Sequence, residues 1–134
     1  PSHCTGSGKA LLAALDDDSL RERIRSMDLY RVTPHTITDE KQLWDDLMLT
    51  RKRGYSISKR EWILDLYSIG MPIINQKGRV EAAVNLSLSM EEAKGKLLKE
   101  MLEQLIDLGR NLSLAMGYSK EYPLIPTHAD GGRN

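Results

Sequence analysis

The amino-acid sequence predicts an α+β domain in which helices cover one face of an antiparallel sheet. Helix-forming segments occupy the first part of the chain, and shorter segments of strand length follow them. A long segment with apolar residues at three- and four-residue steps comes last and predicts a C-terminal helix. At 134 residues the chain has room for one domain with its own core, so these elements are expected to pack together.

Two short helices are predicted at the start of the chain. The run from Gly8 to Leu15 is built from strong helix formers, and the side-chain oxygen of Thr5 or Ser7 can cap it. Three aspartates then interrupt the apolar run. The residues Ser19 to Glu22 match a capping box, which predicts a second helix that ends near Met27.

A loop and a longer helix come next. The stretch from Tyr30 to Thr38 contains Pro34 and several β-branched or hydroxyl residues, which favour extended chain. Thr38 is the expected N-cap of a helix from Asp39 to Arg53, whose acidic start and basic end suit the helix dipole. Gly54 is the expected stop, because glycine readily takes the left-handed conformation that ends many helices.

Three segments of strand length follow the third helix, and a turn joins the last two into a hairpin. They cover residues 55–58, 65–74 and 79–88, with the turn at residues 75–78. Two or three strands make a marginal sheet, so the sheet is expected to be completed by residues before Pro1 or by another subunit. The chain is therefore expected to be a fragment of a longer protein.

The last helix begins, by prediction, at a second capping box formed by Ser89 to Glu92. Its apolar residues recur at helical spacing up to about Gly117, and they are Ala93, Leu97, Met101, Leu105, Leu108 and Leu112. The segment from residue 119 to 134 contains prolines and glycines without periodicity. The expected organisation is a domain over residues 1–118 and a flexible tail over residues 119–134.

Composition excludes several classes of function. Lys plus Arg and Asp plus Glu both number 19, so the net charge offers no attraction to DNA by this chain alone. The single cysteine, Cys4, excludes an internal disulfide, two-thiol redox catalysis and a cysteine zinc cage. The three histidines lack metal-ligand spacing, and no nucleophile triad is recognisable, so neither a metal, a cofactor nor a catalytic residue is expected. No apolar run reaches the roughly 20 residues of a membrane span, and a cytoplasmic location is expected.

The register of the hairpin decides which polar side chains meet. If Ile74 pairs with Arg79, Ser68 lies directly opposite Asn85. A glycine bulge at the turn would shift this pairing by one residue.

In the unshifted register, polar side chains gather on one face of the hairpin. These are Ser68, Asn85 and Ser87, and the neighbouring Gly70 and Ala83 are small enough to leave room for a ligand. The patch could line a pocket for a small hydrogen-bonding molecule. The alternative is the solvated face of a half-buried sheet, which the residues alone favour.

A second candidate lies at the start of the first helix. The backbone N–H groups of Gly6, Ser7 and Gly8 are free at a helix N-terminus, where they attract an anion such as a carboxylate. The segment is not a phosphate-binding P-loop, because its spacing differs and Ala10 stands where that loop has a hydroxyl residue. A glycine-rich helix start without a ligand is the alternative that the pattern favours.

The order of motifs resembles the C-terminal effector-binding domain of IclR-type bacterial transcriptional regulators over about residues 1–118. The segments that carry the resemblance are His3 to Ala13, Thr33 to Asp39, Leu43, Leu47, Arg51, Gly54-Tyr55, Glu61, Ile69, Pro72-Ile73, Gly78 to Val80 and Ala82-Ala83. The resemblance implies a GAF-like domain with a curved antiparallel sheet, helices packed against it and an effector pocket. It also implies a small organic acid as effector, assembly into dimers or tetramers, and operator binding by a separate winged helix-turn-helix domain.

The resemblance also assigns site residues. The effector positions of the family fall on Gly6 and Ser7, with the adjoining Gly8, and on the strand residues Ser58, Ser68, Asn85 and Ser87. Relatives often have an acid at Ser58 and a thiol at Ser68, so this chain offers neutral hydroxyls there and is expected to take a different effector from glyoxylate responders.

Two other functions remain as alternatives. A GAF-like sulfoxide reductase would need two thiols, and the single cysteine argues against it. A pure oligomerisation module with a vestigial pocket would explain the departures at Ser58 and Ser68.

Overall fold

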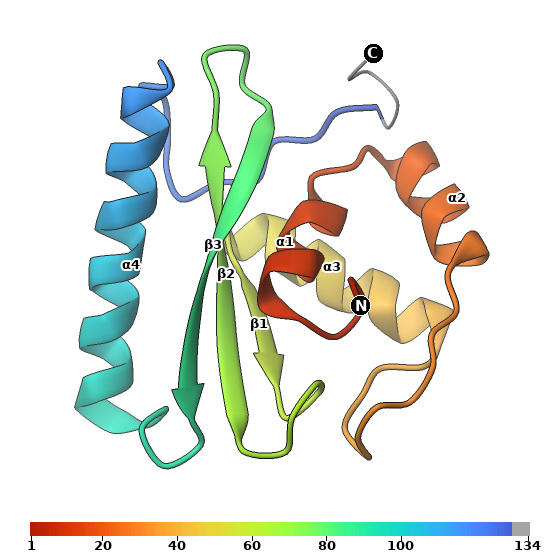
Figure 1. The fold of residues 1–134 in the computed structure, drawn as a ribbon. Coiled ribbons are helices and arrows are strands. Elements are labelled where there is room, and N and C mark those ends of the chain that lie inside the picture. The colour runs from red at the N-terminus through yellow and green to blue at the C-terminus, as the bar shows by residue number, and fades with distance from the viewer. Residues whose placement is uncertain (130–134) are drawn as a thin grey trace.

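Four helices and one sheet make up residues 1–129, the part of the chain that the computed structural model describes (Figure 1). The helices are α1 (Gly6–Ala13), α2 (Asp17–Ser26), α3 (Glu40–Arg53) and α4 (Gly95–Ala115). The strands are β1 (Ser56–Lys59), β2 (Leu66–Ile74) and β3 (Val80–Ser89), and they form an antiparallel sheet in the order β1-β2-β3. The predicted α+β class with a long C-terminal helix is confirmed.

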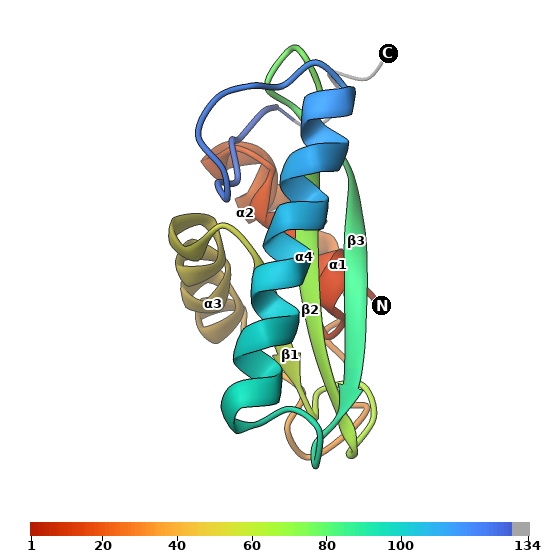
Figure 2. The same ribbon diagram turned by 90° about the vertical axis from the view of Figure 1, so that its left-hand side faces the viewer.

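The two faces of this sheet are covered by different helices. Figures 1 and 2 show α4 running along one face and α1 lying on the other, so the expectation of helices on one face only is wrong. The central strand β2 explains the difference, because it is buried on both sides from Ser68 to Pro72. A strand buried on both sides carries a nearly continuous run of small or apolar residues, and Ile69 to Ile74 is such a run.

The core falls into two apolar clusters. One joins α1, α2 and α3, and its members include Leu12, Leu20, Leu43, Leu47 and Ile125. The other joins the sheet to α4 through Ile69, Met71 and Leu105. Side chains alternate along β2 between the two faces of the sheet. Ile69 and Met71 point toward α4, and Ser68 and Gly70 point toward α1.

The N-caps of the first three helices lie close to the predicted positions. Thr5 caps α1 by accepting a hydrogen bond from the N–H of Gly8, which selects one of the two predicted caps. Asp16 caps α2 and Asp39 caps α3, so the predictions of Ser19 and Thr38 are wrong by a few residues. At the starts of α2 and α3 an aspartate side chain accepts a hydrogen bond from an otherwise unpaired backbone N–H.

The ends of the two longer helices test two further predictions. Gly54 ends α3 with φ of 94°, in the left-handed conformation that its position predicts. The capping box at Ser89 and Glu92 forms both of its reciprocal hydrogen bonds, at 2.9 and 3.2 Å. It caps only a short turn, however, and α4 starts at Gly95, whose φ of 60° separates that turn from the helix.

The hairpin register differs from the predicted one by two residues. Ser68 lies opposite Ser87 and Gly70 opposite Asn85, and a register irregularity between Ile73 and Ile74 accompanies the shift. A shift of two keeps every side chain on its original face. The polar residues therefore remain together although their partners were predicted incorrectly.

The segment after α4 packs on the core as far as residue 129. Ile125 is buried in the cluster of α1, α2 and α3, and His128 forms a parallel bridge with Leu15. The Tyr122 hydroxyl donates to the Pro72 carbonyl, at 2.6 Å. These contacts come from residues 119–129 of the expected tail, and its remaining residues, 130–134, lie outside the described residues. Ile125, which lies between Pro123 and Pro126, provides the apolar contact.

Candidate functional site

A pocket of about 300 Å³ opens where the start of α1 meets β2, β3 and the connection between β1 and β2. Its polar wall comes from the helix start and the sheet, and it consists of Thr5, Gly6, Ser7, Ser68, Asn85 and Ser87. Its apolar wall consists of Trp62 and Ile63, from the connection between β1 and β2, and of Leu66, the first residue of β2. The structure thus joins the two candidate features of the sequence, the helix start and the hairpin patch, into one concavity.

Two glycines allow the helix start to reach the sheet. A Cβ on Gly70 would overlap the carbonyl of Gly6, and a Cβ on Gly6 would come within 2.5 Å of Asn85 Oδ1. The hydroxyl of Ser56 donates a hydrogen bond to the same Gly6 carbonyl and fixes the helix start against β1. The space beside Gly70 is therefore filled by backbone, and the expectation that it leaves room for a ligand is wrong.

A short hydrogen-bond chain organises the polar wall. The N–H of Ser7 donates to Asn85 Oδ1 at 3.2 Å, and Asn85 Nδ2 donates to Ser87 Oγ at 2.9 Å. Within the described part of the chain, the hydroxyls of Ser7 and Ser68 and the N–H of Gly6 make no hydrogen bond. These three groups, together with the positive end of the α1 dipole, suit a ligand with carboxylate or hydroxyl oxygens.

Five of the seven predicted site residues line this pocket, namely Gly6, Ser7, Ser68, Asn85 and Ser87. The other two do not. The N–H of Gly8 is taken by the Thr5 hydroxyl, at 3.2 Å. The buried Ser58 hydroxyl donates to the Cys4 carbonyl at 2.6 Å and fastens the chain before α1 to β1. The geometry places these two residues behind the polar wall.

The apolar wall was missed by sequence reasoning. Trp62 and Ile63 of this wall and the adjoining Leu64 are each more than a third exposed, which is unusual for three consecutive large apolar residues. They directly follow three charged residues, Lys59 to Glu61, between two strands. This change from charged to apolar residues is the sequence signal that could have indicated the wall. No lining residue of the pocket is charged, so a bound anion would be held by dipoles and hydroxyls alone.

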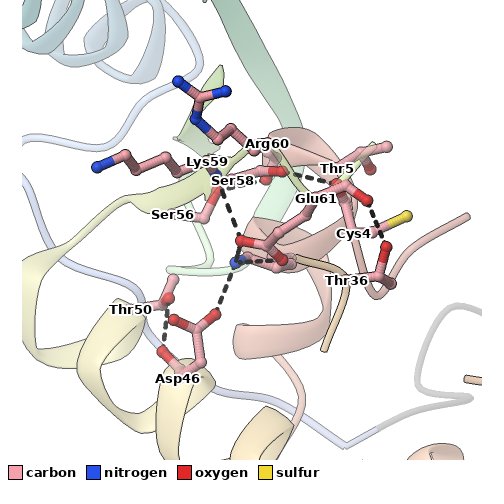
Figure 3. A network of polar contacts seen from close by, with 12 residues as sticks. Cys4, Thr5, Thr36, Asp46, Thr50, Ser56, Ser58, Lys59, Arg60 and Glu61 are labelled. Atoms are coloured by element: carbon pink, nitrogen blue, oxygen red, sulfur yellow. Dashed lines mark hydrogen bonds and ion pairs between the residues drawn. The ribbon is translucent and has the colours of Figure 1, made fainter. Parts of the chain in front are cut away.

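A buried cluster of charges lies directly behind the apolar wall. The side chain of Lys9 is fully buried, and its Nζ lies 2.7 Å from Asp46 Oδ2 and 3.0 Å from Glu61 Oε2. Figure 3 shows the side chain of Asp46, from α3, and that of Glu61, from the segment just after β1, pointing toward one another. Burial raises the pKa of the Glu61 carboxyl, and the charge of Lys9 opposes the rise. This cluster was not predicted, because a lysine among helix formers gives no sign of burial.

Other candidate groups have structural partners. His3 is buried, and its Nε2 lies 2.9 Å from the Tyr30 carbonyl. Cys4 is buried, and its pKa is raised by desolvation, which makes its thiol a poor nucleophile. Arg51 donates hydrogen bonds to the carbonyls of Ala13 and Leu15 at the end of α1 and forms an ion pair with Asp17, so its guanidinium group stabilises the fold.

Neither a metal-binding group of three or more His, Cys, Asp or Glu side chains nor a helix long and apolar enough to cross a membrane occurs within residues 1–129.

Residues 1–114 match the family model described as bacterial transcriptional regulator IclR C-terminal. The chain belongs to the IclR family. Among curated relatives, the p-hydroxybenzoate hydroxylase transcriptional activator of Acinetobacter baylyi is 35% identical over 111 residues, which cover 83% of this chain and 40% of that protein. The transcriptional repressor AllR of Escherichia coli is 32% identical over 117 residues, covering 87% of this chain and 43% of the repressor. This IclR-family chain thus spans less than half the length of these relatives.

Solved structures of IclR-family proteins share the fold. The C-terminal domain of the E. coli transcriptional regulator KdgR aligns with a TM-score of 0.82 and 30% identity, over 88% of this chain and 72% of that one. A double mutant of the inducer-binding domain of PobR from Acinetobacter, in complex with 3-hydroxybenzoic acid, aligns with a TM-score of 0.78 and 32% identity. That alignment covers 84% of this chain and 65% of the other. The curated relatives are named as a transcriptional activator and a transcriptional repressor.

Proposed function

We propose that this chain is the effector-sensing domain of a transcriptional regulator and binds a small organic acid in the pocket between α1 and the sheet. The observation that carries the proposal is the composition of the pocket, with unbonded polar groups on one side and Trp62 and Ile63 on the other. A carboxylate at the Gly6 N–H and the Ser7 hydroxyl would leave the body of the acid between Ser68 and the apolar wall.

The ligand expected from this arrangement carries an acid group and an apolar or planar body. The apolar wall disfavours the smallest, fully hydrated acids, because their oxygens would lie against side chains that cannot hydrogen-bond. The PobR relative complexed with 3-hydroxybenzoic acid is consistent with a ligand of this kind. Binding would shift the equilibrium between arrangements of the whole regulator. In that regulator, a separate winged helix-turn-helix domain would bind operator DNA, in the cytoplasm and as a dimer or tetramer.

A thermal-shift panel with calorimetry tests the proposal directly. The panel compares glyoxylate and pyruvate with 3-hydroxybenzoate and longer aliphatic acids. A ligand at 100 times its dissociation constant adds about 2.7 kcal/mol to stability, which is a shift of several degrees for a domain of this size. We expect the acids with apolar bodies to stabilise the protein most. If no acid on the panel shifts the unfolding temperature, the proposal fails.

A second candidate function, a pure oligomerisation module, is favoured by the outer surface of α4. Leu97, Leu108 and Leu112 follow one another at helical spacing there, and each is more than a third exposed. Sedimentation velocity over a range of concentrations measures self-association. Self-association without binding of any acid would replace the sensing proposal with this one.

A further inference from the structure

Hydrogen bonds fix the backbone of Arg60 and Glu61, directly before the apolar wall of the pocket. The hydroxyl of Thr33 donates to the Arg60 carbonyl at 2.5 Å, and the hydroxyl of Thr36 donates to the Glu61 carbonyl at 2.7 Å. Arg60 has φ of 60°, a conformation that residues with a side chain rarely adopt. The two threonines thus hold the chain in an unfavourable turn immediately before Trp62.

The side chain of Glu61 fixes the same point from the other side. Both of its carboxylate oxygens accept hydrogen bonds from Lys9 Nζ, at 3.2 and 3.0 Å, and Oε2 also accepts from the Lys59 N–H at 3.3 Å. Lys9 belongs to α1, the helix whose first residues form the polar wall. Glu61 therefore connects the apolar wall to the polar wall through a single buried lysine.

Neutralising Lys9 does not by itself require Glu61. Asp46 Oδ2 lies closer to the ammonium group, at 2.7 Å, and belongs to α3, which contributes no residue to the pocket. One carboxylate would be enough to balance one buried ammonium charge. The second carboxylate comes from the residue directly before the pocket wall, which gives it a role that Asp46 does not have.

We propose that Glu61 is a positioning residue for the effector pocket: by binding Lys9 it sets the distance of Trp62 and Ile63 from the start of α1. This inference rests on the proposed function only where it concerns ligand affinity, because the position of Trp62 can be measured without a ligand. Loss of the contact lets the wall segment move outward and loosens the fit of the apolar body of the ligand.

Two isosteric substitutions separate positioning from simple charge balance. Glu61→Gln replaces one accepting oxygen with a donor, so at least one hydrogen bond to Lys9 or Lys59 is lost, while Asp46 still neutralises the lysine. Asp46→Asn is the matched control, because it also removes one of the two charges but leaves the link to Glu61 intact.

The readout uses a single tryptophan. The chain has two tryptophans, and Trp44 lies in α3 against Arg21, so Trp44→Phe leaves Trp62 as the sole reporter in the wall. In this background we expect Glu61→Gln to shift Trp62 emission to longer wavelength and to increase its quenching by acrylamide. Asp46→Asn should leave both values close to those of the parent. Affinity for whichever acid binds the parent should fall about tenfold in Glu61→Gln alone.

Each outcome bears on one claim. If Trp62 is unchanged in Glu61→Gln, or if Asp46→Asn moves it equally, Glu61 has no positioning role. A displaced Trp62 with unchanged ligand affinity also overturns the proposal. If no acid binds the parent protein, the sensing function fails, and the movement of Trp62 alone still decides the positioning role.

A second variant covers the case in which Glu61→Gln does not fold. Thr36→Val keeps the shape of the side chain and removes the hydroxyl that donates to the Glu61 carbonyl. We expect it to move Trp62 in the same direction by a smaller amount. An unchanged Trp62 in Thr36→Val would contradict the inference that this backbone attachment holds the wall.

Discussion

The two faces of the central strand β2 have different surroundings: one packs in the apolar core and the other lines the pocket. Toward α4 the strand presents Ile69 and Met71, which are fully buried among apolar side chains. Toward α1 it presents Ser68 and Gly70, where the helix approaches by its polar end and leaves a pocket open to solvent. The difference shows how a single strand can supply both stability and a site: side chains at alternate positions meet different partners.

The largest effect is expected on the α4 face. Met71→Ala removes a fully buried side chain from the cluster formed with Ile69 and Leu105. Large-to-small substitutions of this kind cost about 2–5 kcal/mol, because a cavity remains where the side chain was. Urea unfolding measures this loss. The affinity for the acid should stay within about threefold of the parent, since the pocket lies on the other face. A large loss of affinity would contradict the separation of the two faces.

Gly70→Ala is the corresponding change on the α1 face. The added methyl group would overlap the Gly6 carbonyl, so α1 must move away from the sheet or β2 must bend. Overpacking of this kind costs about 1–3 kcal/mol. Because the Gly6 and Ser7 backbone groups move with the helix, we expect affinity to fall together with stability. Calorimetry measures the affinity and urea unfolding measures the stability of both variants. In Met71→Ala only the stability should fall.

The sequence predicts some features of these two faces and not others, depending on whether the signal is local. Spacing along β2 and β3 places Ser68, Asn85 and Ser87 on one face, and this survives the two-residue error in register because the side-chain period is two. Propensity and caps predict the first three helices to within a few residues, since those signals are local. The burial of Lys9 and the contact of Trp62 with the pocket depend on where distant segments meet, and no local pattern encodes that.

Two polar residues of the pocket should differ in what they contribute. Asn85 bridges the Ser7 N–H and the Ser87 hydroxyl, so Asn85→Ala should cost about 0.5–1.5 kcal/mol of stability for each bond and also weaken binding. The Ser68 hydroxyl makes no hydrogen bond within the described part of the chain, so Ser68→Ala should leave stability almost unchanged and weaken binding only. Unfolding curves and calorimetry on both variants check this. Unchanged affinity in both would remove these residues from the site.

The smallest expected effect is a pH dependence of stability that arises from Glu61, which contacts Lys9 of α1. Burial raises the pKa of Glu61 in the folded protein above its ordinary value of 4.5. A carboxyl whose folded pKa is raised stabilises the fold fully below its unfolded pKa, and this contribution is lost as the pH rises through the folded pKa. The stability advantage of the parent over Glu61→Gln should therefore shrink as the pH is raised from about 4 to about 7, measured by urea unfolding. Lys9 limits the change, because its charge favours the ionised carboxylate and holds part of the interaction at neutral pH. An advantage that instead grows with pH would mean that the attraction of Lys9 outweighs the cost of burying the carboxylate, and that the cluster stabilises the α1 side most when all of its charges are present.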